Sequence, residues 1–219
     1  MSLTLYYAPG ACSFVPHSLL EMAGATFEPQ LVKLHKNEQN SPEYKAINPR
    51  GQVPVLVVDG KPLTQIVAIV GYIDARFPQA GLLPTDPFER AKALELLAWM
   101  NNSVHPTFTH FFRPEKFAAE HSTQALIKSH AATSYKPLLQ ELDALAARAQ
   151  AEGRGFLVGD SFGPADAYAL VLLRWGGFAG HDPEGFPALW AHVQKVAVLP
   201  GVARTIERER LVLNVYKPA

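Results

Sequence analysis

The chain has 219 residues, 48% of them hydrophobic, and its 20 Lys plus Arg balance its 20 Asp plus Glu, so the formal net charge is zero. This length suffices for one large domain or two small ones, and the neutral balance lacks the basic footprint that nucleic-acid binding requires. A single cysteine excludes a disulfide within the chain, and no signal-peptide pattern or membrane-length apolar run is evident. We therefore expect a cytoplasmic protein without nucleic-acid or membrane partners, either a small-molecule enzyme or an oligomeric interaction protein.

The first part of the chain alternates strand and helix patterns. Residues 3–7 predict a short strand that ends at Ala8-Pro9-Gly10. Residues 13–23 predict a helix, because apolar side chains at positions 15, 19, 22 and 23 form one face, and Gly24 suits the position after its end. Residues 27–34 predict a second strand. The helix between the two strands supplies the crossover that parallel pairing requires.

The pattern continues with a short helix and a hairpin. Ser41 followed by Pro42 is typical of an N-cap and the first helical position. Residues 53–58 predict a β-branched strand, and Asp59-Gly60 is a hairpin signal that leads to a strand at residues 62–64. Residues 66–77 predict a helix. The resulting order, β-α-β-α-β-β-α, is that of a thioredoxin-like α/β domain.

The second part of the chain is helical. Residues 77–87, rich in proline and glycine, predict a linker, and helical patterns follow at residues 88–112, 122–152, from 163 onward, 186–198 and 202–209. We interpret Gly163-Pro164-Ala165-Asp166 as a structural helix start, in which the Asp166 side chain reaches back to the N-cap N–H. We expect an α/β domain over residues 1–79 and an all-α domain over residues 87–219.

Cys12 is the first candidate for chemistry. It lies between a predicted strand end and a predicted helix start, where free N–H groups and the helix dipole favour a thiolate and lower the thiol pKa. The alternative is a buried cysteine that packs as a small hydrophobic residue. The local sequence leaves both alternatives open.

Two further segments could contact a ligand through the backbone or an amide. Proline is out of place at the start of a central strand, and a cis Val53–Pro54 bond would leave the N–H and C=O of Val53 free. An ordinary trans proline that opens the strand is the alternative. Gln65 could bind an amino-acid head group through its amide, although N-capping of the helix by Thr64 explains this segment more simply.

The helical part offers His105 and several aromatic residues. His105 could reach the first domain from its helix, although a lone helical histidine is more often structural or exposed. No close pair among the eight histidines has metal-ligand spacing with acidic partners, so we predict no metal. Large aromatic side chains of the helical part could line an apolar pocket, but core packing is the simpler use of most of them: Trp99, Phe108, Phe111, Phe112 and Trp175.

These segments, in this order, resemble the cytosolic glutathione transferase family, and among its members most resemble the bacterial beta class. The resemblance covers nearly the whole chain. It rests on the segment 6–17, on Asn48-Pro49-Arg50-Gly51-Gln52-Val53-Pro54, on Phe88-Glu89-Arg90, on His105 and Trp175, and on the capping sequence that ends at Asp166. It implies a thioredoxin-like domain followed by an all-α domain, a homodimer, glutathione as cosubstrate, and a detoxification enzyme that transfers glutathione to an electrophilic small molecule.

The resemblance also implies where the cysteinyl part of glutathione binds. Cys12 is implied to face the glutathione sulfur, through a thiol-stabilising contact or a mixed disulfide formed by thiol-disulfide exchange. The main chain of Val53, next to Pro54, is implied to pair with the cysteinyl backbone. His105 is implied to come to the same cleft from the second domain.

At the two ends of glutathione the chain departs from the family pattern. Gln65 is implied to hold the γ-glutamyl end, but Ile66 follows it where the family often has serine or another small residue, so that only the Ile66 N–H remains. Lys33 or His35 is implied to meet the glycyl carboxylate. Pro106 stands where a lysine often follows the histidine.

These departures keep other functions open. Loss of one hydrogen bond to a charged group costs about 1.5–3 kcal/mol, which weakens binding roughly tenfold to hundredfold. The first alternative is a non-catalytic glutathione-transferase-like protein that serves in binding or dimerisation. A glutathione-dependent isomerase is a further possibility, because the fold alone does not choose among these activities.

Overall fold

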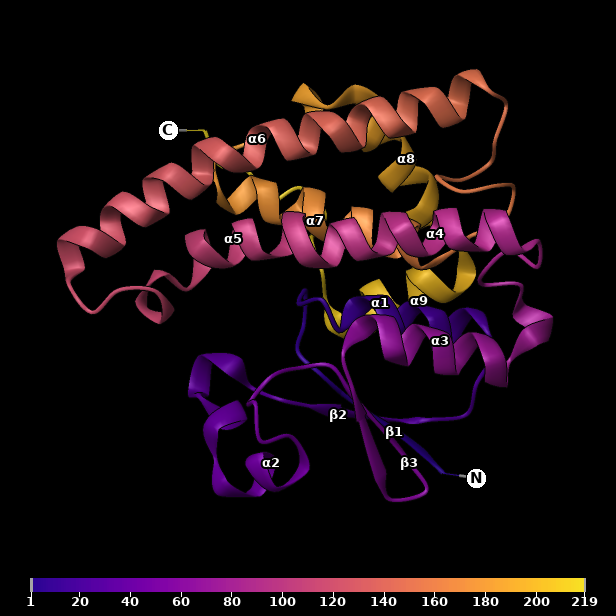
Figure 1. The fold of residues 1–219 in the computed structure, drawn as a ribbon, viewed down its shortest axis with the longest axis horizontal. Coiled ribbons are helices and arrows are strands. Elements are labelled where there is room, and N and C mark those ends of the chain that lie inside the picture. The colour runs from indigo at the N-terminus through magenta and orange to yellow at the C-terminus, as the bar shows by residue number, and fades with distance from the viewer. Residues whose placement is uncertain (1, 219) are drawn as a thin grey trace.

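Residues 2–218 are described by the computed structural model, which places a small α/β layer beneath a layer of helices (Figure 1). Four strands form one sheet in the order β2-β1-β3-β4. They are β1 (Leu3–Tyr7), β2 (Glu28–Leu31), β3 (Val55–Val58) and β4 (Lys61–Thr64). β1 pairs parallel with β2 and antiparallel with β3, and β3 pairs antiparallel with β4. The predicted parallel crossover and the hairpin at Asp59-Gly60 are both confirmed.

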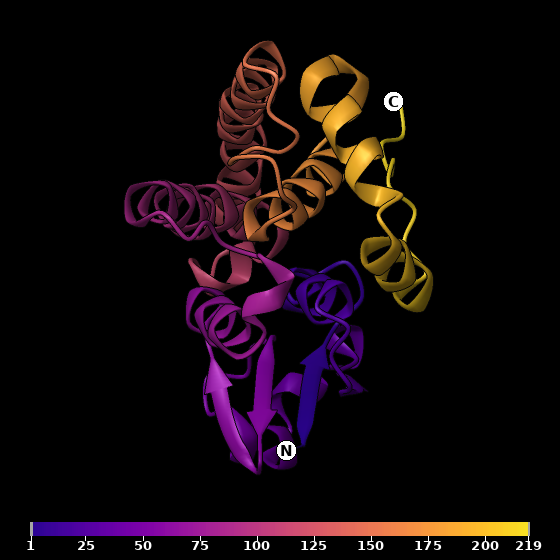
Figure 2. The same cartoon turned by 90° about the vertical axis from the view of Figure 1, so that its right-hand side faces the viewer.

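Three helices accompany the sheet, namely α1 (Phe14–Met22), α2 (Pro42–Ile47) and α3 (Ile66–Arg76). α1 and α3 lie between the sheet and the helical layer, and α2 lies on the other side of the sheet (Figures 1 and 2). The predicted start of α2 is confirmed, because the Ser41 hydroxyl accepts a hydrogen bond from the Tyr44 N–H at 3.1 Å and Pro42 is the first helical residue.

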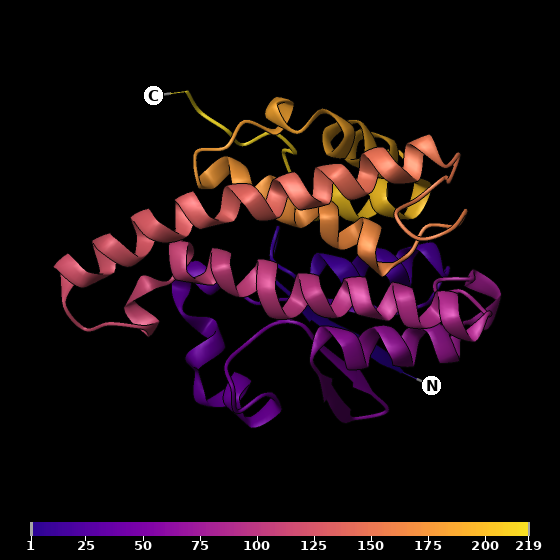
Figure 3. The ribbon, with the colours of Figure 1, turned by 45° about the horizontal axis from the view of Figure 1, so that its top comes forward.

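The helical layer contains α4 (Pro87–Trp99), α5 (His105–Phe112), α6 (His121–Ala151), α7 (Pro164–Phe178), α8 (Pro187–Ala197) and α9 (Pro200–Glu209). α6 runs alongside α4 and α5, which follow one another end to end, and it projects at one end of the molecule (Figure 3). α7 is buried along most of its length and packs against α1, α4, α6 and α8. In the part of the chain described, no helix combines the length and apolarity that crossing a bilayer requires.

The last helix returns to the first domain. α9 packs against α1, and a Cβ atom at Gly201 would lie 2.6 Å from the Met22 nitrogen. Only glycine therefore permits this close approach. Arg204 Nε also donates to Glu21 Oε2 on α1 at 2.8 Å. These contacts hold the start of α9 against the end of α1, and the antiparallel packing of the two helices brings Glu209, at the end of α9, beside His17 of α1.

Several predicted elements need correction. The second strand spans four residues instead of residues 27–34, because the chain turns into short 3-10 segments at Leu34–Lys36 and Glu38–Asn40. β3 begins at Val55, after the Val53–Pro54 bond, instead of at residue 53. The helix predicted over 88–112 is interrupted by a π-helical turn at Met100–Val104. This turn adds a residue to the helical repeat and shifts the side chains that follow it.

Candidate active site

A cavity of about 850 Å³ lies between the α/β layer and helices α5 and α7. Every residue that the sequence assigns to the site lines it: Cys12, Lys33, Val53, Pro54, Gln65, Ile66 and His105. They come from the loops after β1, β2 and α2, from the start of α3, and from α5. The fold therefore brings together residues that are dispersed over most of the chain. Within residues 2–218, no group of three or more His, Cys, Asp or Glu side chains is placed to hold a metal ion.

The Cys12 thiol is buried and protonated. It is 8% exposed and lies in the loop of residues 8–13, called the Cys12 loop below. Burial raises the pKa of the thiol to about 12, and the charge of Glu209 adds to this effect. Hydrogen bonding from the backbone N–H groups of Cys12 and Ser13 lowers the pKa by less than burial raises it. Of the two alternatives that the sequence left open, the lowered pKa is therefore wrong, and Cys12 is buried as the other alternative describes.

The Val53–Pro54 peptide bond is cis, as one of the two sequence interpretations requires. The Val53 carbonyl is not free, because it accepts a hydrogen bond from Cys12 Sγ at 3.5 Å. The Val53 N–H, in contrast, has no partner among the described residues. The preceding residue is fixed, since Asn48 Nδ2 donates to the Gln52 carbonyl at 2.7 Å. This arrangement leaves one backbone donor beside the thiol.

The start of α3 lacks a side-chain cap. Thr64 belongs to β4, so the predicted N-capping by Thr64 is wrong. Gln65 occupies the N-cap position at φ 72° and makes no capping hydrogen bond. Such a backbone conformation is uncommon outside glycine and concentrates at functional sites. The Ile66 side chain is buried in the core, so it can serve a ligand only through its backbone N–H.

His105 is a neutral imidazole in the same cavity. Its Nδ1 lies 2.6 Å from the Tyr168 hydroxyl, and its ring packs edge-on against Trp175 with centroids 4.8 Å apart. Burial lowers the pKa of His105 to about 4, and the positive charge of Lys116 contributes. At neutral pH this side chain can therefore act through hydrogen bonding and not through charge.

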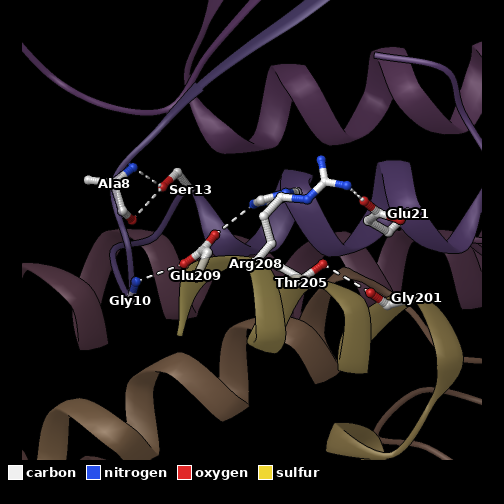
Figure 4. A network of polar contacts seen from close by, with 9 residues as sticks. Ala8, Gly10, Ser13, Glu21, Gly201, Thr205, Arg208 and Glu209 are labelled. Atoms are coloured by element: carbon white, nitrogen blue, oxygen red, sulfur yellow. Dashed lines mark hydrogen bonds and ion pairs between the residues drawn. The ribbon is translucent and has the colours of Figure 1, made fainter. Parts of the chain in front are cut away.

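Two residues hold the Cys12 loop through contacts that the sequence did not predict. Glu209, at the end of α9, accepts a hydrogen bond from the Gly10 N–H at 2.8 Å, and its other oxygen lies 2.7 Å from His17 Nδ1. Figure 4 shows this carboxylate between the loop and α1. Trp175 Nε1 donates to the Gly10 carbonyl at 2.8 Å. The pattern around Glu209 carries no signal of this role, because its partners lie almost 200 residues earlier in the chain.

The comparisons with known proteins agree with this geometry. Residues 1–75 match the family described as the glutathione S-transferase N-terminal domain, and residues 100–200 match the glutathione S-transferase C-terminal domain. A glutathione S-transferase of Xanthomonas campestris pv. campestris is 35% identical over 210 residues, which cover 95% of this chain and 100% of that protein.

Two solved structures share the whole fold. A glutathione transferase homologue from Sulfitobacter, with bound glutathione, has a TM-score of 0.89 at 27% identity and covers 96% of this chain and 99% of that one. The bacterial beta class glutathione S-transferase of Sphingomonas chungbukensis has a TM-score of 0.79 at 31% identity and covers 95% of this chain and 100% of that one.

These matches extend over both layers of the molecule, and the chain belongs to the glutathione S-transferase family. It has the family's thioredoxin-like domain followed by a helical domain, and it resembles the bacterial beta class. It is accordingly a glutathione transferase, an enzyme for which glutathione is the cosubstrate.

Proposed function

We propose that glutathione lies extended across the cavity, with its cysteinyl part against Val53 and its sulfur beside Cys12, and attacks an electrophilic small molecule there. The observation that carries this proposal is the meeting of three features in one cavity: the Cys12 thiol, the unpaired Val53 N–H and the uncapped start of α3. The Val53 N–H would donate to the cysteinyl carbonyl. These are the donors that an extended peptide with a thiol at its centre requires.

The two ends of glutathione would meet opposite ends of this row of donors. The γ-glutamyl carboxylate would accept from the N–H groups at the start of α3, beginning with Ile66, where the helix dipole favours an anion. The Gln65 amide would hold the same end. Lys33 would meet the glycyl carboxylate, and its 3.6 Å ion pair with Glu38 is a half-exposed surface pair that contributes little and can be exchanged.

At the sulfur, a protonated Cys12 would act as a hydrogen-bond donor. Its thiol would turn from the Val53 carbonyl to the glutathione sulfur and stabilise the thiolate, with neutral His105 beside it. The raised pKa of Cys12 disfavours the alternative role in thiol-disulfide exchange, because exchange needs the cysteine as thiolate. The thiol-stabilising role is therefore the one we propose.

We also propose that the protein is a cytoplasmic homodimer that acts in detoxification, with domains over residues 1–79 and 87–219. Membership in the family and the presence of a single cysteine support these points. Reduced glutathione and a small-molecule electrophile would be its ligands.

Calorimetric titration with reduced glutathione tests the proposal. We expect a Kd near 0.1 mM, which corresponds to about −5.5 kcal/mol. Gln65→Ala should weaken binding about tenfold, because it removes a hydrogen bond to a charged group. Gln140→Ala, an exposed residue of α6 outside the cavity, is the matched control and should leave the Kd unchanged. Absence of binding at millimolar glutathione would refute the proposal and favour the non-catalytic alternative.

A further inference from the structure

The charged side chains that line the cavity are all positive. The described residues that line it include no Asp or Glu, although the whole chain has equal numbers of acidic and basic residues. Its lining contains five basic side chains: Lys33, Arg50, Arg113, Lys116 and Arg174. Lys33 and Arg50 belong to the α/β layer, where the proposed function places the glutathione carboxylates. The other three belong to the helical layer, so the half of the cavity left for the electrophile is also positive.

Arg174 is the basic residue in this half that the fold holds most firmly. Its Nε donates to the Val212 carbonyl at 2.8 Å, and its Cζ lies 5.2 Å from the centre of the Phe178 ring. Its Nη1 would lie 2.6 Å from a Cβ placed on Gly10, so the guanidinium lies against the Cys12 loop. The side chain is thus oriented from two sides against Gly10 of the Cys12 loop.

The Arg174 guanidinium lacks a carboxylate partner. Among the described residues, no ion pair includes Arg174. Burial lowers the pKa of Arg174, and the nearby negative charge of Glu209 offsets part of this effect, but the two oxygens of Glu209 are already engaged by His17 and Gly10. A guanidinium remains charged in proteins and offers paired donors that fit a carboxylate. The Nη donors of Arg174 are therefore available to an anion in the cavity.

The neighbouring basic residues differ in this respect. Arg113 pairs with Glu115, so its charge is compensated. Lys116 is exposed and makes no ion pair among the described residues. Its positive charge contributes to the lowered pKa of His105. The walls between these residues are aromatic, with Phe108 and Trp175 stacked 4.8 Å apart and Phe112 and Phe178 exposed to the cavity.

We propose that the electrophile is a planar aromatic molecule that carries a carboxylate, and that Arg174 binds this carboxylate. Lys116 adds attraction at the cavity mouth. This inference rests on the proposed function, since it requires glutathione in the other half of the cavity. In the reaction the glutathione thiol releases its proton to solvent, the thiolate sulfur forms a bond to the ring carbon, and the leaving group departs with the electron pair of the bond that breaks.

A matched pair of substrates tests the inference. We compare 4-chloro-3,5-dinitrobenzoate with 4-chloro-3,5-dinitrobenzamide, both of which lose chloride to glutathione, and divide each kcat/KM by the uncatalysed rate. The wild-type enzyme should prefer the benzoate about tenfold or more. Arg174→Gln should lower the benzoate value about tenfold and the benzamide value less than about twofold, and Arg174→Lys should be intermediate. Arg148→Gln removes an exposed charge of α6 outside the cavity and should change neither value.

Binding measurements separate failure of this inference from failure of the proposed function. Calorimetry with glutathione should give the same Kd for Arg174→Gln and wild type, and a weaker Kd would assign Arg174 to glutathione and overturn the inference. If glutathione does not bind at all, the proposed function fails, and unreactive 3,5-dinitrobenzoate and 3,5-dinitrobenzamide are then titrated directly: a preference for the benzoate that depends on Arg174 still supports the carboxylate site at Arg174, and no preference overturns it. Equal values for the acid and the amide in the wild type, or an equal loss for both in Arg174→Gln, would overturn it.

Discussion

Cys12 in the folded protein should react with iodoacetamide at pH 7.5 at least about a hundredfold more slowly than a free cysteine. A thiol whose pKa is about 12 holds far less thiolate at this pH than one with a pKa of about 8.5. The greater intrinsic nucleophilicity of a more basic thiolate recovers only part of this difference. The rate should also keep rising with pH above about 9, where a free thiol levels off.

The control for this experiment is the same chain unfolded in urea. Cys12 is the single cysteine, so all alkylation reports on this residue. In the unfolded chain Cys12 should react at the rate of a free cysteine. The difference between the two rates would show that the fold suppresses its reactivity. A fast reaction of the folded protein with a plateau near pH 8 would contradict the account and restore the mixed-disulfide role.

Asp166→Ala should lower the free energy of unfolding by about 3–5 kcal/mol, because it leaves two backbone N–H donors without their partner and removes a buried carboxylate beside His192. The Asp166 side chain is 1% exposed and accepts hydrogen bonds from the Gly163 N–H at 2.8 Å and the Leu157 N–H at 3.0 Å. His192 Nε2 also lies 2.9 Å from one of its oxygens. Such a loss is a large part of a typical stability of about 5–15 kcal/mol.

Urea denaturation followed by circular dichroism measures this change. Asp160→Ala is the matched control, since Asp160 lies in the loop that precedes α7, is exposed, and accepts one hydrogen bond from the Gly155 N–H at 3.3 Å. It should cost less than about 1 kcal/mol. A loss for Asp166→Ala as small as that of the control would show that the capping interaction does not stabilise the helical domain as we infer.

The parts of the fold that local chemistry determines were predictable from sequence. Ser41 and Pro42 start α2, Asp59-Gly60 turns the hairpin, and Gly163 starts α7 with its N–H donating to the Asp166 side chain. In each case the residues that form the feature are within a few positions of one another. The order of these features was therefore sufficient to identify the two-layer architecture.

The features of the site that were missed depend on contacts between distant segments. The pKa of Cys12 rises because the fold buries its thiol against the Val53 carbonyl and because the charge of Glu209 on α9 adds to this effect, and a helix-start argument considers neither. Glu209 and Arg174 lie in ordinary helical sequence, and only the packing of α9 and α7 against the Cys12 loop gives them a role. The residues predicted from sequence line one cavity, but the electrostatics of that cavity required the structure.

The pKa of the glutathione thiol in the complex tests the central claim most directly. The wild-type enzyme is saturated with glutathione, and the ultraviolet absorbance of the thiolate is followed against pH, with S-methylglutathione as the blank. We predict a midpoint at least about one unit below the value of about 8.5 for a free thiol, because the Cys12 donor stabilises the bound thiolate. A midpoint equal to that of free glutathione would contradict the claim that this cavity activates the thiol.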